Sequence, residues 1–323
     1  MRIGTIGSGA IVEDFVSAAR LVEGVTIEAV FSRTKQRASE FAEIIGVKKY
    51  YDNIEAMFRD ESIDFIYIAS PNSLHYDYVK TALSYNKHVI VEKPFVLNYD
   101  KALELVSISQ EKNLMLFEAI CNIHMPNYEL IKNNIKDLGD IKLVQANYSQ
   151  YSSRYDAYLN KENPNVFNPL YSGGCLADLN VYNIHFVVGL FGRPQKVNYF
   201  ANKGYNGIDT SGILILEYDD FMVELTAAKD SFSYNFAQIQ GEKGYMMAHG
   251  GSNSLEKISI MSKSSQETIN LQDKPRLFYQ IRTFKEIYDK MNYQQRDYYL
   301  EQSLAVVQVL ETALNQVDLN YKK

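Results

Sequence analysis

The chain has 323 residues, of which 46% are hydrophobic and 22% charged, so we expect two folded domains rather than a disordered protein. The net charge of −6 and the absence of a dense Lys/Arg block in the sequence argue against nucleic-acid or anionic-membrane binding. Only two cysteines occur, Cys121 and Cys175, and their spacing indicates neither a disulfide framework nor a structural zinc site. These properties are typical of a globular protein from a reducing compartment.

The opening residues form an apolar run that is too short for a signal peptide. No continuous apolar run approaches the ~20 residues that cross a bilayer. We therefore expect a cytoplasmic protein with no membrane partner.

Strand-like and helix-like segments alternate over the first third of the chain. The expected strands cover residues 3–6, 25–31, 65–69, 88–91 and 114–117. The expected helices cover 11–21, 35–45, 54–59, 74–84 and 99–110. Pro71 suits the first position of one helix, and Asn98 can cap another. This alternation predicts βαβ units around a parallel sheet whose two faces are both buried.

The pattern changes after residue 120. Helices are expected over 127–136, 179–190, 278–291 and 298–317, and strands over 141–151, 197–201, 212–218, 221–227 and 235–240. Short turns such as Asp219-Asp220 favour a largely antiparallel sheet. We predict an α/β protein with a parallel-sheet domain over 1–120 and an α+β domain with an open sheet over 121–323, the last helix being free to pack back on the first domain.

A glycine turn follows the first expected strand and opens the first expected helix. It reads Gly7-Ser8-Gly9-Ala10-Ile11. Gly7 permits a tight turn, Gly9 allows close approach of a pyrophosphate, and the helix N-terminus offers free N–H groups. Val12 replaces the usual third glycine or alanine, which makes the motif alone weak evidence for close helix–strand packing around a dinucleotide. A turn without ligand fits the motif equally well, but the strand–turn–helix context favours a dinucleotide-binding Rossmann domain.

The end of the second expected strand bears on the choice of dinucleotide. Enzymes that use NAD tend to place an acid there for the ribose 2′-hydroxyl, whereas here Glu28 lies mid-strand and the tip reads Ser32-Arg33. Ser32 and Arg33 can bind a 2′-phosphate, and Arg37 adds positive charge. We expect NADP as the preferred cofactor, with NAD as the alternative. A solvated helix start would also explain the basic cluster.

Polar segments follow three of the expected parallel strands, where ligands bind in open α/β sheets. We expect cofactor contacts from the following residues: Ala69, Ser70, Pro71, Asn72, His75, Glu92, Lys93 and Asn122. No histidine pair shows metal-ligand spacing with a carboxylate, so we predict no catalytic metal.

An ordered set of motifs carries a family resemblance over nearly the whole chain. Pro71-Asn72-Ser73-Leu74-His75, Glu92-Lys93-Pro94 and the stretch from Gly173 to His185 resemble the glucose–fructose oxidoreductase/inositol dehydrogenase (Gfo/Idh/MocA) family. The resemblance implies an N-terminal Rossmann domain and a C-terminal domain whose open sheet often forms an oligomer interface. An uncovered sheet face should also be an exposed apolar area, so we expect a homo-dimer or homo-tetramer.

The resemblance implies that Lys93 lies near the nicotinamide and the reacting substrate carbon, and that its peptide bond to Pro94 is cis, as it often is in the family. Without the resemblance, a surface lysine at a strand end is the simpler interpretation. Asp178, Tyr182 and His185 share one face of an expected helix. Inositol dehydrogenases usually have histidine at the position of Tyr182. In this respect the sequence resembles the branch of the family that contains glucose–fructose oxidoreductase and dimeric dihydrodiol dehydrogenase.

These residues suggest a division of roles. Tyr182 would donate a proton to a carbonyl with Lys93 lowering its pKa, and Asp178 would orient Lys93 or a substrate hydroxyl. His185 is either catalytic or structural. We also place Arg154, Tyr155 and Asn168 along the substrate cleft from their position.

The sequence thus predicts an oxidoreductase that transfers hydride between nicotinamide and a carbonyl or alcohol carbon of a sugar or polyol. Two alternatives stay open: an NAD-dependent glycoside-cleaving relative without net redox, and a non-catalytic dinucleotide-sensing regulator. Lys93, Tyr182 and Asp178 argue against the regulator, because a sensor does not need groups that move protons.

Overall fold

The computed structural model describes residues 1–319, which divide into two compact units. The first unit combines Met1–Ala119 with Lys274–Leu304, and the second combines Ile120–Asp273 with the residues from Ala305 on. We predicted the second domain over 121–323 and left only its last helix free to pack back on the first domain. The segment from Lys274 instead belongs to the first unit, because Phe284 stacks on Phe117 with ring centroids 4.4 Å apart.

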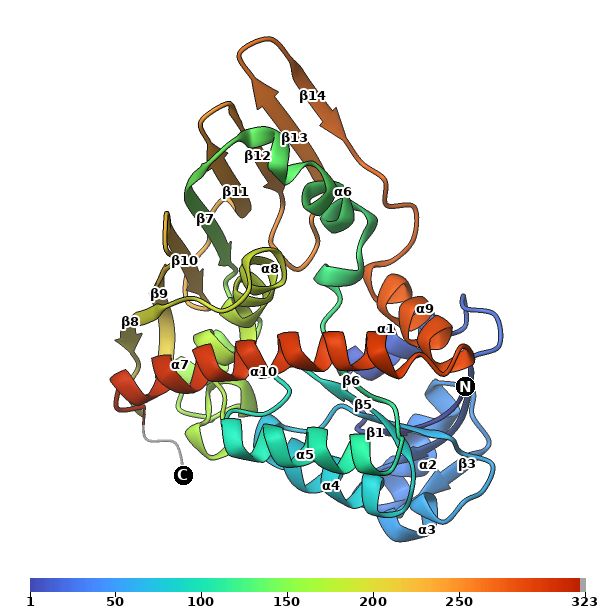
Figure 1. The fold of residues 1–323 in the computed structure, drawn as a ribbon. Coiled ribbons are helices and arrows are strands. Elements are labelled where there is room, and N and C mark those ends of the chain that lie inside the picture. Colours follow the sequence, from blue (N-terminus) through green and yellow to red (C-terminus); the bar gives the residue numbers. More distant parts are fainter. Residues whose placement is uncertain (320–323) are drawn as a thin grey trace. The chain divides into compact units, whose positions relative to one another are not determined.

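The first unit contains a six-stranded parallel sheet in the order β3-β2-β1-β4-β5-β6 (Figure 1). Its strands are β1 (Arg2–Ile6), β2 (Thr26–Phe31), β3 (Lys49–Tyr51), β4 (Phe65–Ile68), β5 (His88–Glu92) and β6 (Leu116–Ala119). The predicted parallel pairing is confirmed, and β3 is an addition. The strand order reverses direction between β1 and β4, which is where ligands bind in sheets of this kind.

The helices that connect these strands, as the alternating sequence pattern predicts, are α1 (Ala10–Ala19), α2 (Lys35–Ile44), α3 (Ile54–Phe58), α4 (His75–Ser84) and α5 (Tyr99–Glu111). The first unit also includes α9 (Arg276–Asp289) and the first part of α10 (Tyr293–Gln316), which come after the last strand in the chain. The Asn98 side chain accepts a hydrogen bond from the Lys101 N–H, which confirms the predicted cap. Pro71 precedes a 3₁₀ turn, Asn72–Leu74, instead of starting the helix itself.

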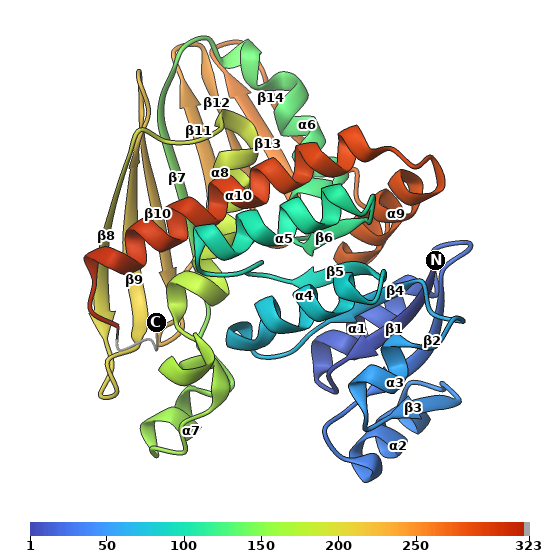
Figure 2. The same ribbon diagram turned by 60° about the horizontal axis from the view of Figure 1, so that its bottom comes forward.

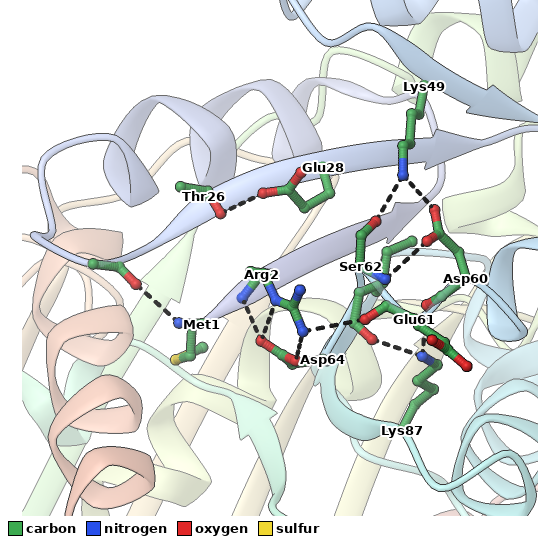
Figure 3. Close-up of polar contacts among 12 residues, drawn as sticks. Met1, Arg2, Thr26, Glu28, Lys49, Asp60, Glu61, Ser62, Asp64 and Lys87 are labelled. Carbon is green, nitrogen blue, oxygen red and sulfur yellow. Dashed lines mark hydrogen bonds and ion pairs between the residues drawn. The ribbon is translucent and has the colours of Figure 1, made fainter.

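A polar network joins the amino ends of the strands in the first unit (Figure 3). Arg2 pairs with Asp64 at 2.6 Å and donates to the Glu61 carbonyl. The Lys87 ammonium, only 8% exposed as a residue, donates to the carbonyls of Asp60 and Ile63. These contacts fix the strand starts and leave the opposite, carboxyl edge for a ligand.

The second unit is built on an eight-stranded sheet in the order β14-β13-β12-β11-β7-β10-β9-β8. Its strands are β7 (Ile141–Ser149), β8 (Lys196–Lys203), β9 (Asp209–Glu217), β10 (Met222–Ala228), β11 (Phe236–Gly241), β12 (Gly244–His249), β13 (Lys257–Ser262) and β14 (Gln266–Ile269). Only β7 and β10 pair in parallel. The predicted, largely antiparallel sheet is confirmed, and its last three strands are additions.

Helical segments of the second unit include α6 (Pro126–Asn134), α7 (Tyr155–Leu159) and α8 (Val181–Phe191). Helix α8 follows a π-type turn, Leu176–Asn180, and its first eight residues are buried. Within Pro169–Phe191 the chain is long and apolar enough to cross a membrane, by length and composition alone, but 78% of that apolar window is buried inside the protein. Such burial is what a core helix shows.

Helix α8 lies on one face of the second sheet (Figure 2). The opposite face carries polar side chains at its centre. There the Gln145 amide donates to Glu224 at 3.0 Å and accepts from Gln240 at 3.1 Å. Large apolar side chains are exposed around this centre: Phe200, Ile213, Met222, Phe232 and Tyr234. We expected an exposed apolar area on this face, and the exposed apolar side chains instead surround a polar, amide-rich centre.

Candidate active site

The glycine turn has a geometry suited to a pyrophosphate. Gly7 has a φ of +121°, and a Cβ there would lie 2.6 Å from the Ala69 carbonyl oxygen. Gly9 precedes α1 without a capping side chain, and a Cβ there would meet nothing within 4 Å. The open space and the uncapped helix N-terminus fit a bound phosphate. Val12, in place of the usual third glycine or alanine, is fully buried.

The tip of β2 lies beside this turn, because the Gly7 N–H donates to the Phe31 carbonyl at 3.3 Å. Ser32 follows directly and is buried, whereas Arg33 and Arg37 are exposed. Glu28 lies three residues before the end of the strand, and its carboxylate accepts a hydrogen bond from the Thr26 hydroxyl at 2.6 Å (Figure 3). The residues that directly follow the strand therefore carry a hydroxyl and a cation rather than an acid.

His75 connects the loops that follow β4 and β5. Its ring is fully buried, with Nδ1 2.9 Å from the Pro94 carbonyl and Nε2 3.0 Å from the Ser70 carbonyl. Burial lowers the pKa of His75, opposed by these backbone contacts. The imidazole thereby holds the segments Ala69–Asn72 and Lys93-Pro94 in place, and the peptide bond between Lys93 and Pro94 is cis.

Buried carboxylates anchor the backbone on both sides of Lys93. Glu92 accepts a hydrogen bond from the Tyr67 hydroxyl at 2.6 Å, and burial raises the pKa of Glu92. The Phe95 N–H donates to Glu118 Oε1 at 2.8 Å. Lys93 itself is half-buried. Tyr67 is a residue of this site that we did not predict, and its signal is a polar group inside an otherwise apolar buried strand.

The motif in the second unit departs from a regular helix. Asp178 lies in the π-type turn, whereas Tyr182 and His185 lie on α8, so the α-helical spacing we assumed does not hold through Asp178. Tyr182 is 6% exposed, and its ring meets Tyr148 edge-on with centroids 5.9 Å apart. Asp178 Oδ2 lies 2.7 Å from the ammonium of Lys229, a residue that the sequence analysis did not single out.

Asn122 and His185 are both buried in the second unit. The Asn122 amide donates to the Tyr182 carbonyl at 2.9 Å and accepts from the Ile123 N–H at 3.0 Å, so it supports the start of α8. The pKa of His124 is lowered to about 3, by burial first and then by the neighbouring His185. Cofactor binding by Asn122 and a catalytic role for His185 remain predictions.

The predicted cleft residues of the second unit lie around α7. The Arg154 backbone precedes this helix, and Tyr155 packs edge-on against Tyr151. Asn168 is 7% exposed, and its side chain accepts a hydrogen bond from the Leu170 N–H. Asn168 thus already stabilises a local turn.

A parallel sheet with a glycine turn at its switch point and a strand tip of Ser32-Arg33 defines a Rossmann-type dinucleotide-binding protein. Residues 1–120 match the model of an oxidoreductase family with an NAD-binding Rossmann fold, and residues 129–247 match the GFO/IDH/MocA C-terminal domain.

Curated relatives extend this match over most of the chain. The uncharacterized oxidoreductase YgjR of Escherichia coli is 36% identical, covering 82% of this chain and 81% of that protein. The scyllo-inositol 2-dehydrogenase (NADP(+)) IolU of Bacillus subtilis is 32% identical, and the match covers 99% of this chain and 98% of IolU. The chain therefore belongs to the Gfo/Idh/MocA family of NAD(P)-binding oxidoreductases, as its motifs predicted.

A solved structure shares the same fold. It is KijD10, a 3-ketoreductase from Actinomadura kijaniata in complex with NADP and TDP-benzene. The TM-score is 0.86 at 19% sequence identity, with 98% of this chain and 97% of that chain covered.

Proposed function

We propose that the protein is an NADP-preferring dehydrogenase or reductase that acts on a carbon bearing a hydroxyl or carbonyl in a sugar or polyol. The tip of β2 carries the cofactor part of this proposal, because Ser32 and Arg33 adjoin the phosphate turn while Glu28 is held away by Thr26. IolU supports it as a scyllo-inositol 2-dehydrogenase that uses NADP(+), and KijD10 as a 3-ketoreductase seen with NADP.

The nicotinamide, when bound, accepts or supplies hydride, so the chain must bind the substrate and move one proton. We assign the proton to Lys93 and Tyr182. The Tyr182 phenol donates to the carbonyl oxygen in the reducing direction, and Lys93 takes part in the same proton transfer. Asp178 accepts a hydrogen bond from a substrate hydroxyl and thereby sets the orientation of the reacting carbon.

Fluorescence titration with NADPH and with NADH tests the cofactor preference. We expect NADPH to bind at least tenfold more tightly, which is about 1.4 kcal/mol. Arg33→Ala should remove most of this preference by weakening NADPH alone. Arg59→Ala is the matched control, because Arg59 is an exposed arginine of the same unit that pairs with Glu55. Tighter binding of NADH, or an Arg33→Ala protein with unchanged preference, would show that the cofactor assignment is wrong.

Lys93→Met and Tyr182→Phe test the proton transfer. Each should lower kcat on a polyol panel about a hundredfold or more, a typical loss for a general acid or base, while NADPH still binds. A variant that keeps its rate is not part of the proton path, and loss of NADPH binding would assign its residue to the cofactor instead.

We also propose a cytoplasmic homo-oligomer that forms through the outer face of the second sheet. Both cysteines are buried thiols, which suits a reducing compartment. The exposed rings and aliphatic side chains around the amide-rich centre suit a self-complementary interface, because a two-fold axis brings the same patch of both subunits together.

A further inference from the structure

We propose that Lys229 is a positioning residue of the active site, which fixes the Asp178 carboxylate for a substrate hydroxyl. This inference rests on the role given to Asp178 above. Lys229 directly follows β10, and its residue is 1% exposed. Its ammonium lies 2.7 Å from Asp178 Oδ2 and 2.7 Å from the Val166 carbonyl oxygen, and 4.4 Å from the centre of the Phe167 ring.

An enclosed ammonium is costly unless its donors are satisfied, and lysine has three of them. Here the carboxylate takes one, the Val166 carbonyl a second, and the face of the Phe167 ring covers the cation. Phe167 is itself fully buried. The position of the charge is therefore fixed by groups that cannot move freely.

The main chain on both sides of the ion pair is also anchored. The Lys229 N–H donates to the Thr210 carbonyl at 2.8 Å, and its carbonyl accepts from the Ser152 N–H at 2.9 Å. The turn that bears Asp178 is held by the Leu176 N–H, which donates to the buried Asp209 at 2.6 Å. Neither partner can shift without breaking contacts elsewhere in the unit.

The two side chains differ in exposure, and this difference indicates which side of the Asp178 carboxylate can meet a substrate. The Lys229 side chain is 2% exposed, while that of Asp178 is 28% exposed. One part of the carboxylate thus faces a fixed cation in the interior, and another part reaches the surface. A carboxylate held in this way offers a hydroxyl an acceptor of defined direction, so no freedom of the side chain is lost when a polyol binds.

A double-mutant cycle tests whether Lys229 acts through Asp178. The variants are Lys229→Met, Asp178→Asn and the double variant, with oxidation of scyllo-inositol by NADP⁺ followed through NADPH fluorescence. We expect each single change to lower kcat/KM about tenfold or more, and the double variant to be within about twofold of Asp178→Asn. NADPH affinity should stay unchanged in all three.

Lys87→Met is the matched control for removing a buried lysine. Lys87 is a buried lysine that donates to two main-chain carbonyls at the amino edge of the first sheet. Lys87→Met should lower Tm as Lys229→Met does and leave kcat/KM unchanged. If Lys229→Met does not fold, Lys229→Gln takes its place, because glutamine keeps a hydrogen-bond donor without the charge. We expect the same loss of kcat/KM and the same unchanged NADPH affinity from this variant.

The outcomes separate this inference from the proposed function. A normal kcat/KM in Lys229→Met beside a damaged Asp178→Asn, or additive losses in the double variant, would overturn the positioning role and leave the proposed function intact. If Asp178→Asn has no effect, the role of Asp178 itself is wrong, and the inference fails with it.

Discussion

Asp209 is a buried carboxyl group that supports the turn bearing Asp178. It is fully buried, and its Oδ2 accepts hydrogen bonds from the Leu176 N–H and, at 2.8 Å, from the Tyr199 hydroxyl. Burial raises the pKa of Asp209 to about 6, although both hydrogen bonds and the charge of Lys229 act in the opposite direction. The folded protein therefore holds this proton at a pH where the unfolded chain has lost it.

Asp209→Asn should change how stability depends on pH. Between the ordinary value of 3.8 and about 6, the native carboxyl stays protonated while the unfolded one ionises, so the free energy of unfolding falls as pH rises. The shift corresponds to about 3 kcal/mol over that window. Asparagine can accept the same two hydrogen bonds but does not titrate. Urea unfolding of both proteins from about pH 4 to 7 should show wild type losing stability relative to the variant; a constant difference would contradict the assignment.

Site residues differ in whether a local sequence motif can predict them. Lys93 and Tyr182 could be predicted as site candidates because each belongs to a local motif. Lys229 and Asp209 could not, since each depends on a partner that is at least thirty residues away and is met only through tertiary packing. Long-range pairing of this kind leaves no local pattern.

Gly7→Ala and Gly9→Ala separate the two functions of the phosphate turn. A Cβ at Gly7 would lie 2.6 Å from the Ala69 carbonyl oxygen at a positive φ, so we expect Tm to fall and NADPH binding to be lost. At Gly9 a Cβ meets nothing within 4 Å, and φ is −102°. Gly9→Ala should keep the wild-type Tm and weaken only NADPH, as measured by scanning calorimetry and fluorescence titration. Equal loss of Tm in both variants would refute this separation.

Elements were predictable where burial gives a simple pattern. The central strands of the first sheet are buried on both faces and appear as continuous apolar runs, such as β4. The short edge strand β3 has three residues, and none of them is buried. The edge strand β14 has four residues, and none of these is buried either. Strands like these depend on pairing with a neighbour, and their own sequence carries too little signal. The π-type turn before α8 was likewise invisible to a rule built on α-helical spacing.

The outer face of the second sheet should determine the oligomeric state. Ile213 on β9 is 42% exposed within the apolar surround, and an arginine there would put an unpaired charge into the proposed interface. Ile213→Arg should shift the protein toward monomers in sedimentation velocity. Leu103→Arg is the matched control, because Leu103 is 41% exposed on α5 of the first unit. A variant Ile213→Arg with the wild-type sedimentation coefficient would place the interface elsewhere.

The first unit is assembled from two stretches of chain that are 154 residues apart, because Ile120–Asp273 lies between them. Phe65 and Phe117, buried in the parallel sheet, contact Tyr288 and Phe284 from the later stretch. During synthesis the ribosome completes every strand of this sheet long before α9 appears, so the nascent dinucleotide-binding unit leaves those rings without part of their packing. The packing of the first unit is therefore complete only after all strands of the second unit have been translated.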